Sequence, residues 1–252
     1  MKISTQFFEV SDKKIPDLLK NKKVVIISDL HNNRFGKNNK YLIDTIEHLQ
    51  ADALIVAGDL FNGSGNNHNS ICFFEYITKK YPVYMVKGNH EENLKYLNEE
   101  TYEYLNNYKQ PNFVLLDNSC ISFYGAKLYG FTSDEESYKR LFAKKINKEE
   151  IEKKLGNADE NCYNIVVSHN PAQETAYVDW GADVIISGHL HGGFIRIKNK
   201  GIITPQLKMF PKYTSGMYEI KESRLIISRG LGTHFPSLRF FNPAHLIVLE
   251  FK

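Results

Sequence analysis

Short apolar runs alternate with amphipathic segments through the first half of the chain. Each run is four or five residues long, which is typical of a strand buried on both faces of a sheet. The segments between the runs place apolar side chains at helical spacing. This order predicts a largely parallel sheet with right-handed crossovers. The expected strands are residues 24–27, 53–57 and 83–86, and the expected helices are residues 39–49, 71–78 and 94–105.

After residue 112 the pattern changes to short strands with turn residues between them. A charged segment, 139–155, predicts one or two solvent-facing helices, and the C-terminal strands suggest a β-meander. We expect an α/β fold in which two mixed sheets pack face to face as a β-sandwich flanked by helices. The expected strands are residues 113–116, 121–123, 127–131, 165–167, 184–186, 201–204, 217–220, 225–228 and 246–251, with a helix at 172–178.

Composition is that of an ordinary soluble domain, with 42% apolar and 24% charged side chains among 252 residues. Its three cysteines, Cys72, Cys120 and Cys162, show no C-x-x-C spacing. This excludes a disulfide scaffold or a cysteine-built zinc site and favours a reducing compartment. No apolar run approaches the roughly 20 residues that span a bilayer, and the N-terminus lacks a signal-peptide core. We expect a cytoplasmic protein, in solution or peripheral to the membrane.

Charge is unevenly distributed, although the net charge is only +3. Residues 192–252 carry ten of the 32 basic side chains and three of the 29 acidic ones. Two interpretations remain open, an uneven surface composition or a basic wall beside an anion site.

Polar side chains that bind metals well follow five of the expected buried strands. Ligands bind beyond the carboxyl ends of strands in α/β sheets, so these side chains should converge. Carboxylates and imidazoles suit Mn²⁺, Fe²⁺, Co²⁺, Ni²⁺ or Zn²⁺. Even seven of these eight side chains are too many ligands for one ion and suit two ions that share a carboxylate. The i, i+2 pairs should project to one side of extended backbone. The candidates are Asp29, His31, Asp59, Asn89, His90, His169, His189 and His191.

This ordered set of residues also carries a resemblance. Asp29-x-His31, Gly58-Asp59, Gly88-Asn89-His90-Glu91, His169 and Gly188-His189-x-His191 resemble the calcineurin-like metallophosphoesterase superfamily over residues 23–193. The tail at residues 228–233 is similar to a bacterial subgroup of small phosphodiesterase-like members. A single domain over residues 1–252 is then expected, with the metal-site blocks in 23–193 and C-terminal strands and substrate-side loops in 194–252. The resemblance implies one ion on Asp29, His31, Asp59 and His191, and a second on Asp59, Asn89, His169 and His189.

In the family pattern His90 is not a ligand but faces the substrate phosphate. The resemblance implies catalysis by His90, which would donate a hydrogen bond or proton to the leaving oxygen. Glu91 would either orient that imidazole, as Asp59 could, or simply favour the first turn of the next helix. Phe194 and His245 depart from the subgroup, which commonly has Gln and Glu there, and this bears on the substrate. His48, His68, His234 and His245 are expected to be structural or on the surface.

The sequence therefore predicts a dinuclear metal-dependent phosphohydrolase, a phosphodiesterase or phosphatase that uses a metal-bridging hydroxide. The expected substrate is a small or lipid-linked phosphate ester. Segments 205–213 and 234–241 would shape its pocket, and Arg229 or Arg239 would contact its phosphate. Two alternatives stay open: a superfamily nuclease that acts on DNA or RNA, which the small net charge disfavours, and a non-catalytic metal-binding interaction scaffold.

Overall fold

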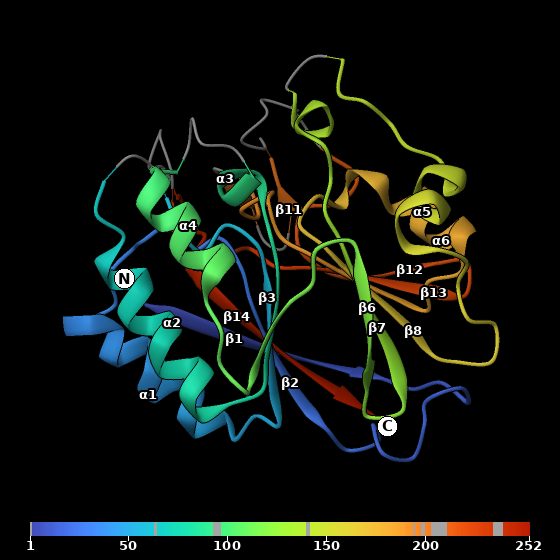
Figure 1. Cartoon of the computed structure of the whole chain (residues 1–252), viewed down its shortest axis with the longest axis horizontal. Helices are drawn as coiled ribbons and strands as arrows, with labels where there is room; N and C mark the ends of the chain where they lie inside the picture. The colour runs from blue at the N-terminus through green and yellow to red at the C-terminus, as the bar shows by residue number, and fades with distance from the viewer. Residues whose placement is uncertain are drawn as a thin grey trace.

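The computed structural model describes residues 2–62, 65–92, 97–139, 142–193, 195–197, 200–202, 211–233 and 239–252. Two six-stranded sheets face each other in its centre, and helices cover their outer faces (Figure 1). The helices are α1 (Lys40–Leu49), α2 (His68–Lys80), α3 (Asn89–Glu92), α4 (Glu99–Asn107), α5 (Lys148–Leu155) and α6 (Glu174–Trp180), with short 3-10 turns at Lys37–Asn39, Glu135–Tyr138 and Pro171–Gln173.

The first sheet has the order β1-β14-β2-β3-β4-β5. Only β14 runs antiparallel to one of its neighbours, β2, and all other pairs are parallel. Its strands are β1 (Ile3–Val10), β14 (Ala244–Phe251), β2 (Lys23–Ile27), β3 (Ala53–Ala57), β4 (Val83–Val86) and β5 (Phe113–Leu115).

The second sheet has the order β12-β13-β9-β8-β7-β6, with antiparallel hairpins at both edges and parallel strands between them. Its strands are β12 (Gly216–Ile220), β13 (Ser223–Ile227), β9 (Val184–Ser187), β8 (Asn164–Ser168), β7 (Ala126–Phe131) and β6 (Ser119–Phe123), and a separate ribbon joins β10 (Arg196–Ile197) to β11 (Lys200–Gly201).

Side chains that point alternately to the two faces of each central strand explain why the fold has four layers, two sheets with helices on either side. In β2, Val24 and Ile26 pack into the core between the two sheets, whereas Val25 and Ile27 pack under α1 and α2. In β9, Val184 and Ile186 pack into the core between the sheets, whereas Ile185 packs into the cluster under α5 and α6. Both faces of these strands are thus buried, as their unbroken apolar composition predicts. The predicted two-sheet sandwich flanked by helices is confirmed.

The ends of the chain differ from the prediction. The described C-terminal strands do not form a continuous meander, because β14 does not follow β13 in the second sheet but lies between β1 and β2 of the first. The sequence analysis missed β1, whose apolar signal is weak because it is an edge strand that pairs only with β14 and leaves Phe7 58% exposed.

Two predicted helices also start later than expected. A capping box between Asn147 and Glu150 sets the start of α5, so residues 142–147 before it are not helical. The helix expected from residue 94 starts at Glu99 after an Asn98 cap, and residues 93–96 lie outside the described part. Phe194, His234 and most of the predicted pocket segments 205–213 and 234–241 also lie outside the described part. Within the described residues, every helix is too short or too polar to cross a bilayer.

Candidate metal centre

The predicted ligands meet where strands of both sheets end, although they are up to 162 residues apart in the chain. Three strands of the first sheet and two of the second point their carboxyl ends at the same place. Asp29 and His31 follow β2, Asp59 follows β3, Asn89 and His90 follow β4, His169 follows β8, and His189 and His191 follow β9.

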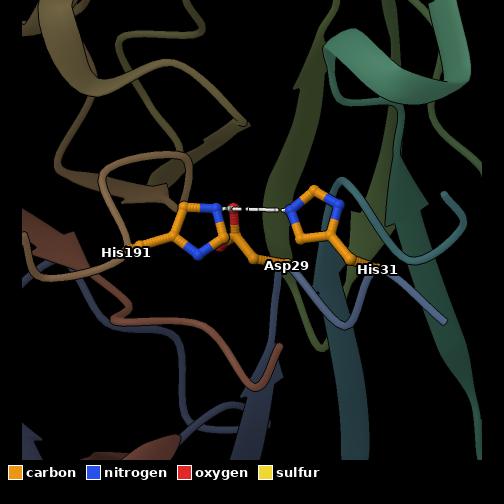
Figure 2. Close-up of side chains that lie close together, drawn as sticks. All are labelled: Asp29, His31 and His191. Carbon is orange, nitrogen blue, oxygen red and sulfur yellow. Dashed lines mark hydrogen bonds and ion pairs between the residues drawn. The ribbon is translucent and has the colours of Figure 1, made fainter. Parts of the chain in front are cut away.

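A first group of potential ligands consists of Asp29, His31 and His191, all of them buried (Figure 2). The Nε2 atom of His191 lies 3.3 Å from Asp29 Oδ1 and 3.3 Å from His31 Nε2. The Nδ1–H of His191 can donate to the carbonyl of Gly232 at 3.3 Å, which leaves the Nε2 lone pair directed at the group.

A second group consists of Asp59, His169 and His189. The Nδ1 atom of His169 lies 2.6 Å from the carbonyl of Ala57, so it carries the proton. Its Nε2 atom, 3.1 Å from Asp59 Oδ2, then offers a lone pair. The nearby Asn89 Oδ1 is buried and accepts no hydrogen bond from the described residues, as expected of an oxygen reserved for a cation.

The two groups adjoin each other. Asp59 Oδ2 is 3.7 Å from His31 Nε2 in the first group, and Asp29 Oδ1 is 3.8 Å from His169 Nε2 in the second. His90 joins this centre through its own group with His31 and Asp59, and its ring contacts the edge of the His31 ring at 4.6 Å between centroids. Seven of the eight candidates from the sequence are therefore brought together, and the eighth, Asn89, directly precedes His90 after the end of β4.

Electrostatics at this point favour positive charge. Burial lowers the pKa of the His169 imidazole, but the Asp59 and Asp29 carboxylates outweigh burial and raise it to about 10. Burial and the Asp59 charge likewise raise the pKa of Asp29 to about 6. Two buried carboxylates, imidazole nitrogens that give up a proton when metal binds, and a buried amide oxygen fit divalent cations of the Mn²⁺ to Zn²⁺ series.

The backbone at the ligands is not extended, which corrects one step of the sequence analysis. Asp29, His31, Asp59, His189 and His191 all have φ between 48° and 69°, the left-handed region that non-glycine residues rarely adopt. The i, i+2 pairs converge through these tight turns and not through strand geometry. Such strained residues cluster at functional sites, where the surrounding structure holds them.

Glu91 holds two of these turns together, a role that the sequence analysis missed. Its fully buried carboxylate accepts backbone N–H bonds from Asp59, Gly88 and Phe61 at 2.8, 2.8 and 3.0 Å. It thereby ties the turn after β3 to the turn after β4. The acidic residue directly after Asn89-His90 is the sequence signal, and neither orientation of the His90 ring nor a helix dipole accounts for these bonds.

The turn that follows β13 lies against the first group of ligands. Leu231 and Gly232 donate backbone hydrogen bonds to the carbonyls of Ser28 and Asp29, at 3.0 and 2.6 Å. A Cβ atom on Gly230 would lie 2.6 Å from the Cβ of Asp29, so only glycine fits there. The two arginines predicted to contact substrate, Arg229 and Arg239, therefore lie beside the metal centre.

His245 is buried beside these arginines and acts as a structural residue. Its Nδ1 accepts the backbone N–H of Arg229 at 3.3 Å, and its Nε2 donates to Gln6 Oε1 on β1 at 3.2 Å. Burial first, then the charges of Arg229, Arg239 and Arg196, lower its pKa to about 2. It is therefore neutral in the folded protein. The expectation that His245 is not a ligand agrees with this place in the structure.

We predict that Glu91→Gln lowers the free energy of unfolding by about 1–3 kcal/mol, because an amide NH2 would face a backbone N–H donor. Metal affinity should fall with it, as the turns after β3 and β4 lose their common anchor. Chemical denaturation and metal titration measure the two effects. Glu92→Gln is the matched control, since Glu92 is part-exposed and pairs with Lys87. Equal effects of the two substitutions would contradict the assigned role.

We also predict that His245→Gln weakens the loss of stability in acid. The folded-state pKa is lowered, so the unfolded chain takes up a proton below about pH 6.5 while the folded chain does not. The resulting penalty reaches about 2 kcal/mol between pH 6.5 and 4.5 and should vanish in the variant. Urea denaturation over this range, with His48→Gln at an exposed position as control, measures it. Parallel curves for the variant and the unaltered protein would rule the effect out.

Comparison with known proteins agrees with this geometry. A family model described as calcineurin-like phosphoesterase matches residues 22–193. An uncharacterized metallophosphoesterase of Campylobacter jejuni is 26% identical over 250 residues, which cover 96% of this chain but 62% of that protein. The uncharacterized metallophosphoesterase YkuE of Bacillus subtilis is 24% identical over 276 residues, or 99% of this chain and 86% of YkuE.

A shorter match, 33% identical over 93 residues, is to the UDP-2,3-diacylglucosamine pyrophosphatase LpxG of Chlamydia muridarum and covers 34% of this chain and 28% of LpxG. Among solved structures, the phosphopantetheinyl hydrolase of Mycobacterium tuberculosis aligns with a TM-score of 0.46 at 14% identity, over 83% of this chain and 89% of that one. Because the family model spans well over half of its residues, the chain belongs to the calcineurin-like phosphoesterase family, and the predicted class of metal-dependent phosphohydrolase is confirmed.

Proposed function

We propose that residues 1–252 form one metallophosphoesterase domain that binds two divalent cations and hydrolyses a phosphodiester or phosphomonoester. The observation that carries this proposal is the pair of adjoining ligand groups, Asp29-His31-His191 and Asp59-His169-His189. Each group gathers three potential ligand atoms within 4.8 Å of one another. With Asn89 they make seven ligands, more than one ion accommodates, and Asp59 lies close enough to both groups to bridge them.

The ions are Mn²⁺, Fe²⁺, Zn²⁺, Ni²⁺ or Co²⁺ in this proposal, since the ligands are all carboxylate, amide and imidazole. When bound, such a pair lowers the pKa of a coordinated water and offsets charge on the phosphate. The protein's own task is orientation. Backbone N–H groups of His189 and His90 donate to the carboxylates of Asp29 and Asp59, at 3.1 and 2.9 Å, and fix their free lone pairs.

His90 is the proposed catalytic residue. It lies on the strand-end turn between the two ligand groups but belongs to neither of the two proposed ligand sets. An imidazole can donate a hydrogen bond or proton to a leaving oxygen near neutral pH. Its contact with the ring of His31 supports a position within reach of a phosphate held at the centre.

A small or lipid-linked phosphate ester is the proposed substrate. A cavity of about 450 Å³ opens beside His189, and its walls combine apolar and basic side chains, which suits an amphipathic ester. The name of the partly similar LpxG, a pyrophosphatase of a diacylated sugar nucleotide, supports including lipid-linked esters. Arg229 and Arg239 would contact a phosphate of this substrate. A cytoplasmic location stays a prediction. The cavity is lined by Tyr138, Phe142, Leu190, Pro211 and Tyr213 and by Lys139, Lys144, Lys145 and Lys212, among others.

We predict that Asp59→Asn removes both ions, because the substitution takes away the shared carboxylate and its charge. Asn89→Ala, which deletes a ligand of one ion only, should retain one. Elemental analysis of the purified proteins after incubation with Mn²⁺ gives the metal content per chain. Two ions retained by Asp59→Asn would remove Asp59 as the bridge.

We further predict that His90→Ala lowers kcat by about 10²–10⁴-fold while the metal content stays intact. Hydrolysis of aryl phosphate monoesters and diesters with added Mn²⁺ measures this effect, and His48→Ala provides an exposed control. Normal turnover in His90→Ala would refute the role of His90. An unaltered, metal-loaded protein that cleaves none of these esters would instead favour the scaffold alternative, and salt-dependent DNA binding would favour the nuclease.

A further inference from the structure

Three arginines converge beside the first group of ligands. A Cβ atom on Gly192, the residue after His191, would lie 2.7 Å from Cγ of Arg229 and 3.1 Å from Nη1 of Arg196. Arg239 reaches the same turn, where its guanidinium donates to the carbonyls of Gly230 and Arg229. The sequence analysis singled out two of these arginines, and the structure adds Arg196, which is 5% exposed.

Within the described part of the chain, Arg229 and Arg239 form no ion pair with an acidic side chain, and the segments outside it contain no Asp or Glu. The carboxylate that acts most strongly on Arg239 is that of Asp29, which belongs to the metal centre. Burial and mutual repulsion lower the pKa of Arg229 and of Arg239 to about 10. Guanidinium groups buried without a counterion are costly unless a ligand supplies one.

Hydrogen-bond donors also remain unused in this cluster. The Nε atoms of Arg229 and Arg239 are both buried and have no acceptor among the residues that the structure describes. His245, which lies among the three arginines, is neutral and has both ring nitrogens engaged, so it offers neither a negative charge nor an acceptor. A planar guanidinium matches the oxygens of a phosphate group, which accepts several such bonds at once.

We propose that Arg196, Arg229 and Arg239 form a second anion subsite, which binds a phosphate-like group of the substrate other than the phosphorus that reacts at the metal centre. This inference rests on the proposed function, whose substrate it narrows to esters with two anionic groups, such as diphosphate esters. The subsite adjoins Asp29 and His191, whereas the cavity with mixed apolar and basic walls adjoins His189. The substrate would then extend across the centre, with its second anionic group at one end and its organic group at the other.

The test compares three p-nitrophenyl phosphodiesters with the Mn²⁺-loaded protein. Their second ester group is a butyl chain that ends in a methyl, a carboxylate or a phosphonate group. The unaltered protein should prefer the phosphonate ester over the methyl ester by about tenfold or more in kcat/KM, because charge-assisted hydrogen bonds are gained. In Arg229→Gln this ratio should fall towards 1, and Arg229→Lys should keep part of it as a point charge.

Arg224→Gln is the matched control, since Arg224 lies at the other end of β13 and pairs with Asp12. It should keep the ratio of the unaltered protein. Arg196→Gln serves as a second variant if Arg229→Gln fails to fold, which thermal melting detects. A ratio near 1 in the unaltered protein, or equal rates for the carboxylate and phosphonate esters, overturns the phosphate subsite while hydrolysis itself upholds the proposed function. If no ester is cleaved, the proposed function fails, and calorimetric binding of butylphosphonate to the unaltered protein and Arg229→Gln still decides on the subsite.

Discussion

The burial of two carboxylates at one point, Asp29 and Asp59, is the constraint on which the rest of the site depends. Both are at most 1% exposed, and both lie within 4 Å of histidine nitrogens from the opposite sheet. Negative charge in such a place is tolerated only beside positive charge and hydrogen-bond donors. Backbone N–H groups supply the donors, and the arrangement leaves the remaining charge to be balanced by cations. The negative charge of the two carboxylates also accounts for the raised pKa of His169.

Rigid sheets make this arrangement possible. Five ligands sit in left-handed backbone that costs on the order of 1 kcal/mol each, and they keep it because they follow strands buried on both faces. The bonds from Glu91 and from the turn after β13 hold these turns from outside the sheets. Packing of residues such as Ile26 and Ile186 between the sheets therefore acts on the chemistry indirectly, since it fixes the strand ends from which the ligands project.

Short patterns of neighbouring residues explain why most strands and candidate ligands could be predicted from the sequence. An apolar run that ends in Asp, Asn or His identifies both a buried strand and its chemistry, and five such runs identified all candidate ligands. The path of β14 could not be predicted in this way, because a strand's sheet depends on long-range pairing and not on its own composition. Neither Arg196 nor the left-handed backbone at Asp29 and His31 has a local signature, since both follow from contacts with distant turns. Glu91 had a signal, its place after Asn89-His90, but two of its three partners lie 30 and 32 residues away.

The two sides of the metal centre differ in a way that bears on selectivity. Within the described residues, the side at Asp29 and His191 is cationic and lined by arginines whose positions are fixed by backbone carbonyls. The side at His189 is a wider cavity with aromatic walls and lysines, two of which pair with acidic neighbours, Lys139 with Glu136 and Lys144 with Asp134 and Glu150. Lysines already paired and near solvent add little binding energy, whereas the buried guanidinium groups of Arg229 and Arg239, which have no ion pair among the described residues, gain a great deal from a ligand. Discrimination between substrates should therefore come from their charge at the arginine side, and the cavity should tolerate variation in the organic group.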